Sequence, residues 1–144
     1  MKIFVYGTLK RGHGNFEYFL KGKSKFLGEG FTNDKFHMRQ VGFPVVLPVG
    51  DPMKRVSGEV FEIDVGPVLA GLDRLEGNGS MYQREERKIL WKPPSNNLEA
   101  EELSKFWDNG ECEAWIYLGM PEHWHGYESL SLGGTRGPWW EWNR

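Results

Sequence analysis

Glycine spacing constrains this chain more than any other feature of its sequence. The 144 residues include 19 glycines, about twice the usual share of roughly 7%, and they are spread along the chain without a period. Short, β-prone apolar segments such as Val45–Val49 and Val56–Ile63 lie between them. Glycine and proline at such intervals favour tight turns and close approach of strands. The pattern predicts a strongly bent sheet or a small barrel.

Strand-like segments recur along the whole chain, and only short helical segments separate them. Together they predict one α+β domain over residues 1–144, built as a small mixed β-barrel of about six strands with flanking helices. The expected strands are Lys2–Tyr6, Lys25–Phe31, Lys35–Met38, Val45–Val49, Val56–Ile63, Tyr82–Trp91 and Glu111–Leu118.

Two segments depart from this pattern. Residues 92–110 begin with a strand-breaking sequence, continue as a short acidic helix over Leu98–Trp107 and end in an Asp-Asn-Gly turn. We expect them to be an insertion between two hairpin strands. Residues 119–144 hold four of the seven tryptophans. We expect so aromatic a tail to dock on the domain or on a second copy in a homodimer, because exposed Trp clusters are costly.

Composition excludes several classes of function. Cys112 is the single cysteine, so an intrachain disulfide and a cysteine-rich zinc site are both excluded. A net charge of −2 gives no basic field for nucleic acid. The N-terminal apolar run is too short for a signal peptide, and no segment approaches the roughly 18 apolar residues of a membrane span. We therefore expect a cytoplasmic protein with no nucleic-acid or membrane partner.

The most informative stretch is Tyr6–Gly14, with the sequence Tyr-Gly-Thr-Leu-Lys-Arg-Gly-His-Gly. It precedes a short helix, which we expect Asn15 to cap and Gly22 to close. The stretch comes near the phosphate-binding pattern G-x-x-x-x-G-K-[ST], but His13 and Gly14 replace the lysine and the hydroxyl, so it is not a P-loop. Consecutive backbone N–H groups in such a turn can still hold an anion or an oxyanion. The alternative is an ordinary strand-to-helix turn.

A glutamate on an apolar helix stripe is the second candidate. The helix is expected to follow an Asp64 N-cap, to have Pro67 in its first turn and to end at Glu76 before Gly77. At about 100° per residue, Glu76 falls within the apolar stripe that includes Leu72. Desolvation and the negative helix end both raise a carboxyl pKa there, which suits acid–base catalysis. The alternative is a Glu76 that turns into solvent at the helix end.

Other chemistry-bearing residues give weaker signals. His123 and His125 are close in sequence, but no third ligand lies nearby, so no metal site is expected. Neither a G-x-S-x-G elbow nor an H-E-x-x-H helix occurs. Cys112 lies in an acidic, strand-like setting that raises a thiol pKa, so we expect it to pack rather than to act as a nucleophile.

Four motifs in order resemble the γ-glutamyl cyclotransferase-like family, including its γ-glutamylamine cyclotransferase and AIG2-like branch. The motifs are Val5–Gly12, Val56–Phe61, Leu72–Gly77 and Tyr82–Arg84, and the resemblance covers about residues 1–91 and the strand that ends at Tyr117. It implies a small mixed β-barrel with flanking helices, an anion-binding loop at Tyr6, Gly7, Thr8 and Leu9, and a catalytic Glu76. Residues 92–110 and the tail depart from the family pattern.

The resemblance implies a cyclotransferase that releases 5-oxoproline from a γ-glutamyl amine or peptide, with Glu76 as general acid and base and with neither metal nor cofactor. Arg84 and Arg11 are candidates to pair with the substrate carboxylate, the alternative being ordinary surface arginines. Tyr82 and Tyr117 are expected to line the mouth of the site or, alternatively, to be core aromatics. A different class stays open, namely a non-enzymatic pocket that sequesters a small anionic metabolite or signalling molecule.

Overall fold

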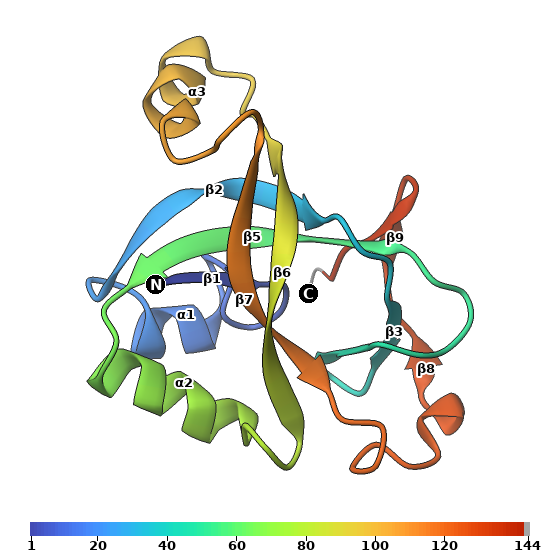
Figure 1. Ribbon diagram of the computed structural model, residues 1–144. Coiled ribbons are helices and arrows are strands. Elements are labelled where there is room, and N and C mark those ends of the chain that lie inside the picture. The colour runs from blue at the N-terminus through green and yellow to red at the C-terminus, as the bar shows by residue number, and fades with distance from the viewer. Residues whose placement is uncertain (143–144) are drawn as a thin grey trace.

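Five strands close into a barrel in the computed structural model, which describes residues 1–142 (Figure 1). The barrel strands are β1 (Lys2–Val5), β2 (Ser24–Thr32), β5 (Arg55–Ile63), β6 (Tyr82–Lys92) and β7 (Glu111–Gly119). Their order is β1, β7, β6, β2 and β5, and β5 pairs with β1 to close the circle. β1 runs parallel to β7, and the other barrel pairs are antiparallel. The predicted α+β fold with a small mixed barrel is confirmed, with fewer barrel strands than expected.

Sharp bends in the long strands allow five strands to close into a barrel. The register of β2 against β5 shifts between Phe26 and Gly28, which marks a β-bulge. Gly58 of β5 lies where a Cβ atom would be 2.3 Å from the Val5 carbonyl oxygen. Only glycine therefore lets β5 cross β1 this closely. The glycine spacing of the sequence reflects close strand contact as well as turns.

Two apolar clusters account for the core. β1 contributes to both because its side chains alternate, so that Phe4 joins one cluster while Ile3 and Val5 join the other. The first cluster includes residues of β2, β5, β6 and β7 and two tail tryptophans. The second lies where the barrel wall meets the helices α1 (Gly14–Phe19) and α2 (Pro67–Glu76), with Leu72 fully buried. The apolar stripe predicted for α2 is thus its core-facing side.

Helix α2 begins and ends close to its predicted bounds. Its last residue is Glu76, and Gly77 follows in the left-handed conformation with φ 60°. Pro67 is its first residue, as expected, but the predicted N-cap at Asp64 is wrong, because Gly66 occupies that position with φ 143°. No helix within the 142 described residues is long and apolar enough to cross a membrane.

The short helix α1 also differs from the prediction at its start. His13 occupies the N-cap position without a side-chain hydrogen bond, so Asn15 does not cap the helix. The Asn15 side chain instead donates from Nδ2 to the Thr8 hydroxyl at 2.7 Å. The helix ends at Phe19, before Gly22. Asn15 therefore ties α1 to the loop that follows β1.

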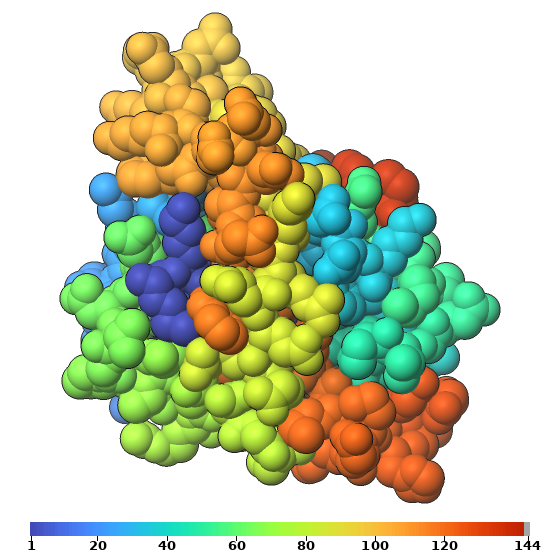
Figure 2. Space-filling view, viewed as in Figure 1, coloured from blue at the N-terminus to red at the C-terminus, as the bar shows by residue number. Residues whose placement is uncertain are grey.

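Residues 92–110 connect β6 to β7 at the far end of a long antiparallel hairpin, as predicted for an insertion. Their helix α3 (Asn97–Ser104) projects beyond the body of the barrel (Figure 1, Figure 2). This helix is shorter than the predicted Leu98–Trp107. Trp107 leaves it and packs into the core, where its indole Nε1 donates to the Leu27 carbonyl oxygen at 3.0 Å.

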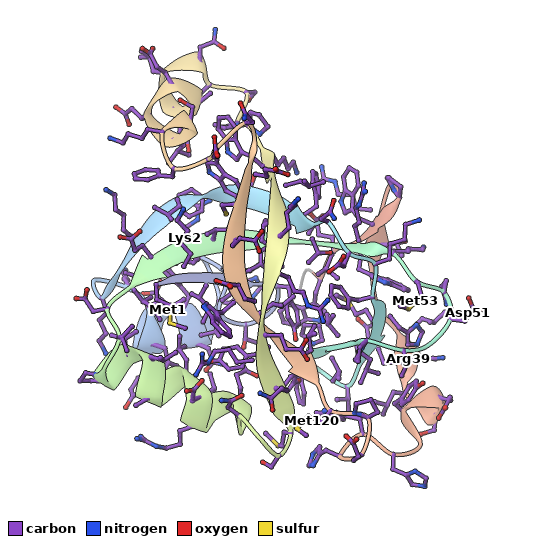
Figure 3. The ribbon with its side chains drawn as sticks, viewed as in Figure 1. Met1, Lys2, Arg39, Asp51, Met53 and Met120 are labelled. Atoms are coloured by element: carbon purple, nitrogen blue, oxygen red, sulfur yellow. The ribbon has the colours of Figure 1, made fainter. Side chains whose placement is uncertain are left out.

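A separate small sheet contains β3 (His37–Gln40), β4 (Pro44–Leu47) and β8 (Ser131–Leu132), and the 3₁₀ helix η1 (Tyr127–Ser129) precedes β8. β4 ends before Pro48, because proline has no N–H for the ladder, so the predicted strand to Val49 is too long. Figure 3 places Arg39 of β3, Asp51 and Met53 on the side of the molecule away from Met1.

The tryptophan-rich tail packs on the barrel of its own chain. Its strand β10 (Trp139–Trp140) pairs with the start of β5 and with β9 (Thr135–Arg136). Trp140 and Trp142 are only 1% and 4% exposed. The buried Lys10 ammonium donates to the Trp142 carbonyl oxygen at 2.6 Å. The described tail docks on its own domain, which is one of the two expected modes, while contact with a second copy stays a prediction. Residues 143 and 144 lie outside the described part of the tail.

Candidate active site

A cavity of about 300 Å³ opens where β1 and α2 end and where β6 begins. Seven of the eight residues predicted to bind substrate or catalyse lie on its wall, and only Arg84 does not. The seven are Tyr6, Gly7, Thr8 and Leu9 after β1, Glu76 at the end of α2, Tyr82 in β6 and Tyr117 in β7. The barrel thus brings together the loop and the glutamate, which lie far apart in the sequence.

The loop after β1 leaves backbone N–H groups without protein partners. Its turn is closed by the Lys10 N–H, which donates to the Gly7 carbonyl oxygen at 3.0 Å. The Thr8 carbonyl oxygen accepts from the Phe16 N–H at 3.2 Å, which fixes the loop against α1. Within residues 1–142, the N–H groups of Gly7, Thr8 and Leu9 donate to no protein acceptor. These N–H groups are available to an anionic group in the cavity.

Close contact with β4 explains the glycine in this loop. A Cβ atom on Gly7 would lie 2.8 Å from Pro44 Cγ and 3.0 Å from its Cδ. Both distances are shorter than real Cβ contacts, and the proline ring cannot rotate away. Gly7 therefore allows the loop after β1 to approach the cavity wall that Pro44 forms.

Glu76 lines the cavity from the last turn of α2, instead of turning into bulk solvent. Burial raises the pKa of its carboxyl from 4.5 to about 7. No hydrogen bond or ion pair reaches this carboxylate from the described residues. A carboxyl with this pKa and no partner can take up and release a proton at neutral pH.

Three tyrosines line the cavity close to Glu76, and each hydroxyl donates to another protein group. Tyr6 donates to the Tyr117 carbonyl oxygen at 2.6 Å, and Tyr82 donates to the Pro44 carbonyl oxygen at 3.4 Å. The Tyr117 hydroxyl donates to Asp73 Oδ1 at 2.6 Å. Burial raises the pKa of all three phenols, and the nearby charge of Glu76 raises it further. The three phenols therefore stay protonated and neutral.

The two candidate arginines are engaged by carboxylates of the protein itself. Arg84 donates from Nε and Nη2 to the two oxygens of Asp73 at 3.0 and 3.2 Å. Arg11 donates from its backbone N–H and Nε to Glu59 at 2.8 and 3.3 Å. Neither side chain lines the cavity. In this structure both guanidinium groups are engaged by the chain itself, and their contact with a substrate carboxylate stays a prediction.

Sequence reasoning did not select several residues that shape the site. Phe43 and Met81 form apolar parts of the cavity wall, and Asn15 lines it beside Thr8. Asp73 does not line the cavity but holds both Tyr117 and Arg84. Its sequence signal is its position on the edge of the apolar stripe of α2, one turn before Glu76.

The weaker candidates lie away from the cavity. Burial raises the pKa of the Cys112 thiol to about 11, which agrees with the expected packing role. His123 and His125 are exposed, and the His123 ring contacts that of Trp124. Among the described residues, no group of three or more His, Cys, Asp or Glu is placed to hold a metal ion.

Comparisons with known proteins agree with the ordered motifs. The model of the family described as gamma-glutamyl cyclotransferase, AIG2-like, matches residues 3–139. The gamma-glutamylaminecyclotransferase of Rattus norvegicus is 32% identical over 143 residues, covering 93% of each chain. The gamma-glutamylcyclotransferase family protein YtfP of Escherichia coli strain K12 is 35% identical over 86 residues, covering 59% of this chain and 70% of that protein.

A solved structure extends the agreement to the fold. The crystal structure of an AIG2-like protein from Mus musculus superposes with a TM-score of 0.70 at 25% identity, and the match covers 99% of this chain and 95% of that one. The family match also runs through residues 92–110 and most of the tail, which the motif pattern had set apart. The chain therefore belongs to the γ-glutamyl cyclotransferase, AIG2-like family.

Proposed function

We propose that this protein is a cyclotransferase that releases 5-oxoproline and a free amine from a γ-glutamyl amine. One observation carries the proposal: a carboxyl with a pKa of about 7, Glu76, shares one cavity with the unpartnered N–H groups of Gly7, Thr8 and Leu9. The first group can move a proton, and the second can hold an anion. An intramolecular attack by an α-amine on its own γ-carbonyl needs both.

In the proposed reaction, the Glu76 carboxylate takes a proton from the α-ammonium of the substrate. The freed amine nitrogen attacks the γ-carbonyl carbon and closes a five-membered ring, while the loop N–H groups hold the α-carboxylate or the oxyanion. The bond between the γ-carbon and the leaving nitrogen then breaks as Glu76 returns its proton to that nitrogen. The second proton of the ring nitrogen passes through the same carboxylate to the released amine, which leaves as an ammonium. Nucleophile and electrophile belong to one bound molecule, so the large effective molarity of intramolecular attack supports the reaction without a metal or cofactor.

The charge of the cavity supports an amine as the leaving group. Glu76 is the one charged side chain among the lining residues within 1–142, and these residues include no Lys, Arg or His. A γ-glutamyl peptide carries a second carboxylate on its leaving part, which would find no cation here and would be repelled by Glu76. The uncharged N-alkyl part of a γ-glutamyl alkylamine fits the apolar wall that includes Phe43, Leu75 and Met81. The name of the rat relative, a gamma-glutamylaminecyclotransferase, points the same way.

The experiment is incubation of the purified protein with γ-glutamyl alkylamines and γ-glutamyl peptides, followed by mass detection of 5-oxoproline. We expect release from the amines, a lower rate with the peptides, and loss of release in Glu76→Gln. Ligand binding without 5-oxoproline from any member of the panel would refute the proposal. That result would favour the pocket that only sequesters a small anion.

A further inference from the structure

The direction of the Tyr117 hydroxyl is fixed by its hydrogen bond to Asp73. A phenol hydroxyl has one hydrogen to donate and lone pairs with which it accepts. The hydrogen of Tyr117 goes to Asp73 Oδ1 at 2.6 Å, a distance typical of a strong bond to a carboxylate. The oxygen of Tyr117 at the cavity wall can therefore only accept, and the neighbouring Arg84 guanidinium already interacts with it.

We propose that Asp73 is a positioning residue, which holds the Tyr117 hydroxyl as a hydrogen-bond acceptor toward the cavity and so forms, with Glu76, the place for the substrate ammonium. The inference rests on the proposed function for the identity of the bound cation. The direction of the hydroxyl itself stands on the structure alone.

Asp73 is held firmly enough to fix that direction. Besides the Tyr117 hydroxyl, its carboxylate accepts two N–H groups of Arg84, at 3.0 and 3.2 Å, in a bidentate pair. Arg84 is fixed in turn, because its backbone N–H donates to Asn78 Oδ1 at 2.9 Å and its guanidinium lies 5.1 Å from the centre of the Trp115 ring. The pair joins α2 to β6 and β7, the elements that carry Glu76, Tyr82 and Tyr117.

Tyr82 repeats the arrangement, because its hydroxyl donates to a carbonyl oxygen of the protein and its oxygen is left as an acceptor. The Tyr6 hydroxyl also donates to a carbonyl oxygen, but its own oxygen already interacts with the Val46 backbone N–H. One side of the cavity thus offers phenol oxygens and the Glu76 carboxylate, and the loop after β1 offers N–H donors. A zwitterionic glutamyl group fits this polarity, with its ammonium beside Glu76 and its α-carboxylate at the loop.

Removing Asp73 should change the pKa of the Glu76 carboxyl, because it frees the Tyr117 hydroxyl. Without Asp73, the hydroxyl is free to turn and donate to the Glu76 carboxylate, and a hydrogen bond to the charged form lowers a carboxyl pKa. The titratable and charged groups around Tyr117 are Asp73 and Glu76 on α2, Arg84 and Tyr82 on β6, and Tyr6 after β1. Loss of the Asp73 charge also lowers the pKa of Glu76, so the test separates the two effects.

The test is a carbon-13 NMR titration of the Glu76 carboxyl in the protein without ligand. We expect the pKa of about 7 in the wild type to fall by about one pH unit in Asp73→Ala. Asp73→Asn, which keeps an acceptor oxygen for Tyr117 but loses the charge, should show only the smaller fall that the lost charge causes. Asp34→Ala is the matched control, because Asp34 pairs with Arg87 at 3.0 Å and neither residue lines the cavity.

A Tyr117→Phe background distinguishes the hydroxyl from the charge. If the hydroxyl carries most of the effect, Asp73→Ala lowers the Glu76 pKa by clearly less when Tyr117 is Phe, because only the charge effect is left. A shift of the same size in both backgrounds would mean that only the Asp73 charge acts, and it would overturn the inference. No shift in Asp73→Ala would overturn it as well. The Asp73 side chain is 27% exposed, so we expect Asp73→Ala to fold. Tyr117→Phe alone should raise the KM, because it removes the acceptor oxygen.

Turnover gives an independent second measurement. Asp73→Ala should lower kcat/KM for a γ-glutamyl amine by about tenfold, the equivalent of one lost hydrogen bond to a charged group. Asp34→Ala should retain wild-type kcat/KM. Failure of the wild type to release 5-oxoproline would refute the proposed function and leave the titration result valid. The two failures are therefore distinguishable.

Discussion

Replacing Glu76 by Gln should change the pH dependence of stability in a way that only a buried, titrating carboxyl explains. Burial raises the pKa of the Glu76 carboxyl in the folded protein from 4.5 to about 7. The folded state therefore holds this proton more tightly than the unfolded state. The resulting stability is fully present below pH 4.5, and it is lost as the pH rises through about 7.

The magnitude follows from the two pKa values of Glu76. At about 1.36 kcal/mol per pH unit, the rise from 4.5 to about 7 corresponds to about 3 kcal/mol at full ionisation. Glutamine has nearly the same volume and no charge, so Glu76→Gln does not lose this stability at high pH. The variant should exceed the wild type by less than about 1 kcal/mol at pH 5 and by up to about 3 kcal/mol at pH 8.5.

Urea unfolding of both proteins at pH 5 and pH 8.5 measures the effect. With an m-value of about 2 kcal/mol per molar urea, the midpoints should differ by about 1.5 M at pH 8.5 and by less than about 0.5 M at pH 5. Glu122→Gln, at an exposed position, is the control and should follow the wild type at both pH values. Parallel pH dependences of wild type and Glu76→Gln would refute the reasoning, because they would mean that Glu76 is solvated. The same samples should show a fall in kcat of about 10²–10⁴ for Glu76→Gln.

Three further predictions concern the pH profile, the loop and the tail. The acid limb of kcat/KM should have its midpoint near the Glu76 pKa of about 7, with activity lost as the carboxylate is protonated below it; a limb near 4.5, measured by initial rates across pH, would contradict the role of Glu76. Gly7→Ala should cost about 1–3 kcal/mol in urea unfolding and raise KM, because its Cβ would contact Pro44 at 2.8 Å; an unchanged KM would contradict it. Lys10→Met should lower stability by about 1–3 kcal/mol, because the buried Trp142 carbonyl oxygen loses its donor, and an unchanged urea midpoint would show that the contact is dispensable.

Some features of the site were predictable because they depend on local periodicity. The helical period places Glu76 on the same face as Leu72, independently of the tertiary structure. Gly77 in the left-handed conformation ends the helix where expected. The helix starts were less predictable. Asp64 is a favourable N-cap residue, but Gly66 occupies the N-cap of α2 with φ 143°. This conformation depends on the position of β5 relative to the helix.

Other features depended on partners that sequence reasoning cannot pair. Arg84 and Asp73 are eleven residues apart in different elements, and only the packing of α2 on β6 brings them together. A lone sequence motif therefore suggested a substrate contact for Arg84, whereas the structure gives the arginine a partner from its own chain. Trp107 was assigned to the exposed helix for the same reason, because nothing local shows that Leu27 and the core lie within its reach.

The sequence by itself determined the order of β1 to β7 and of the helices between them, the loop that follows the first strand and the side of α2 on which Glu76 lies. These follow from periods of 2 and 3.6 residues and from glycine and proline, whose effects are local. Only the tertiary structure decided that β5 closes on β1, and that residues from β1, α2, β6 and β7 enclose one cavity. The raised pKa of Glu76 belongs to this second group, because burial by distant segments causes it.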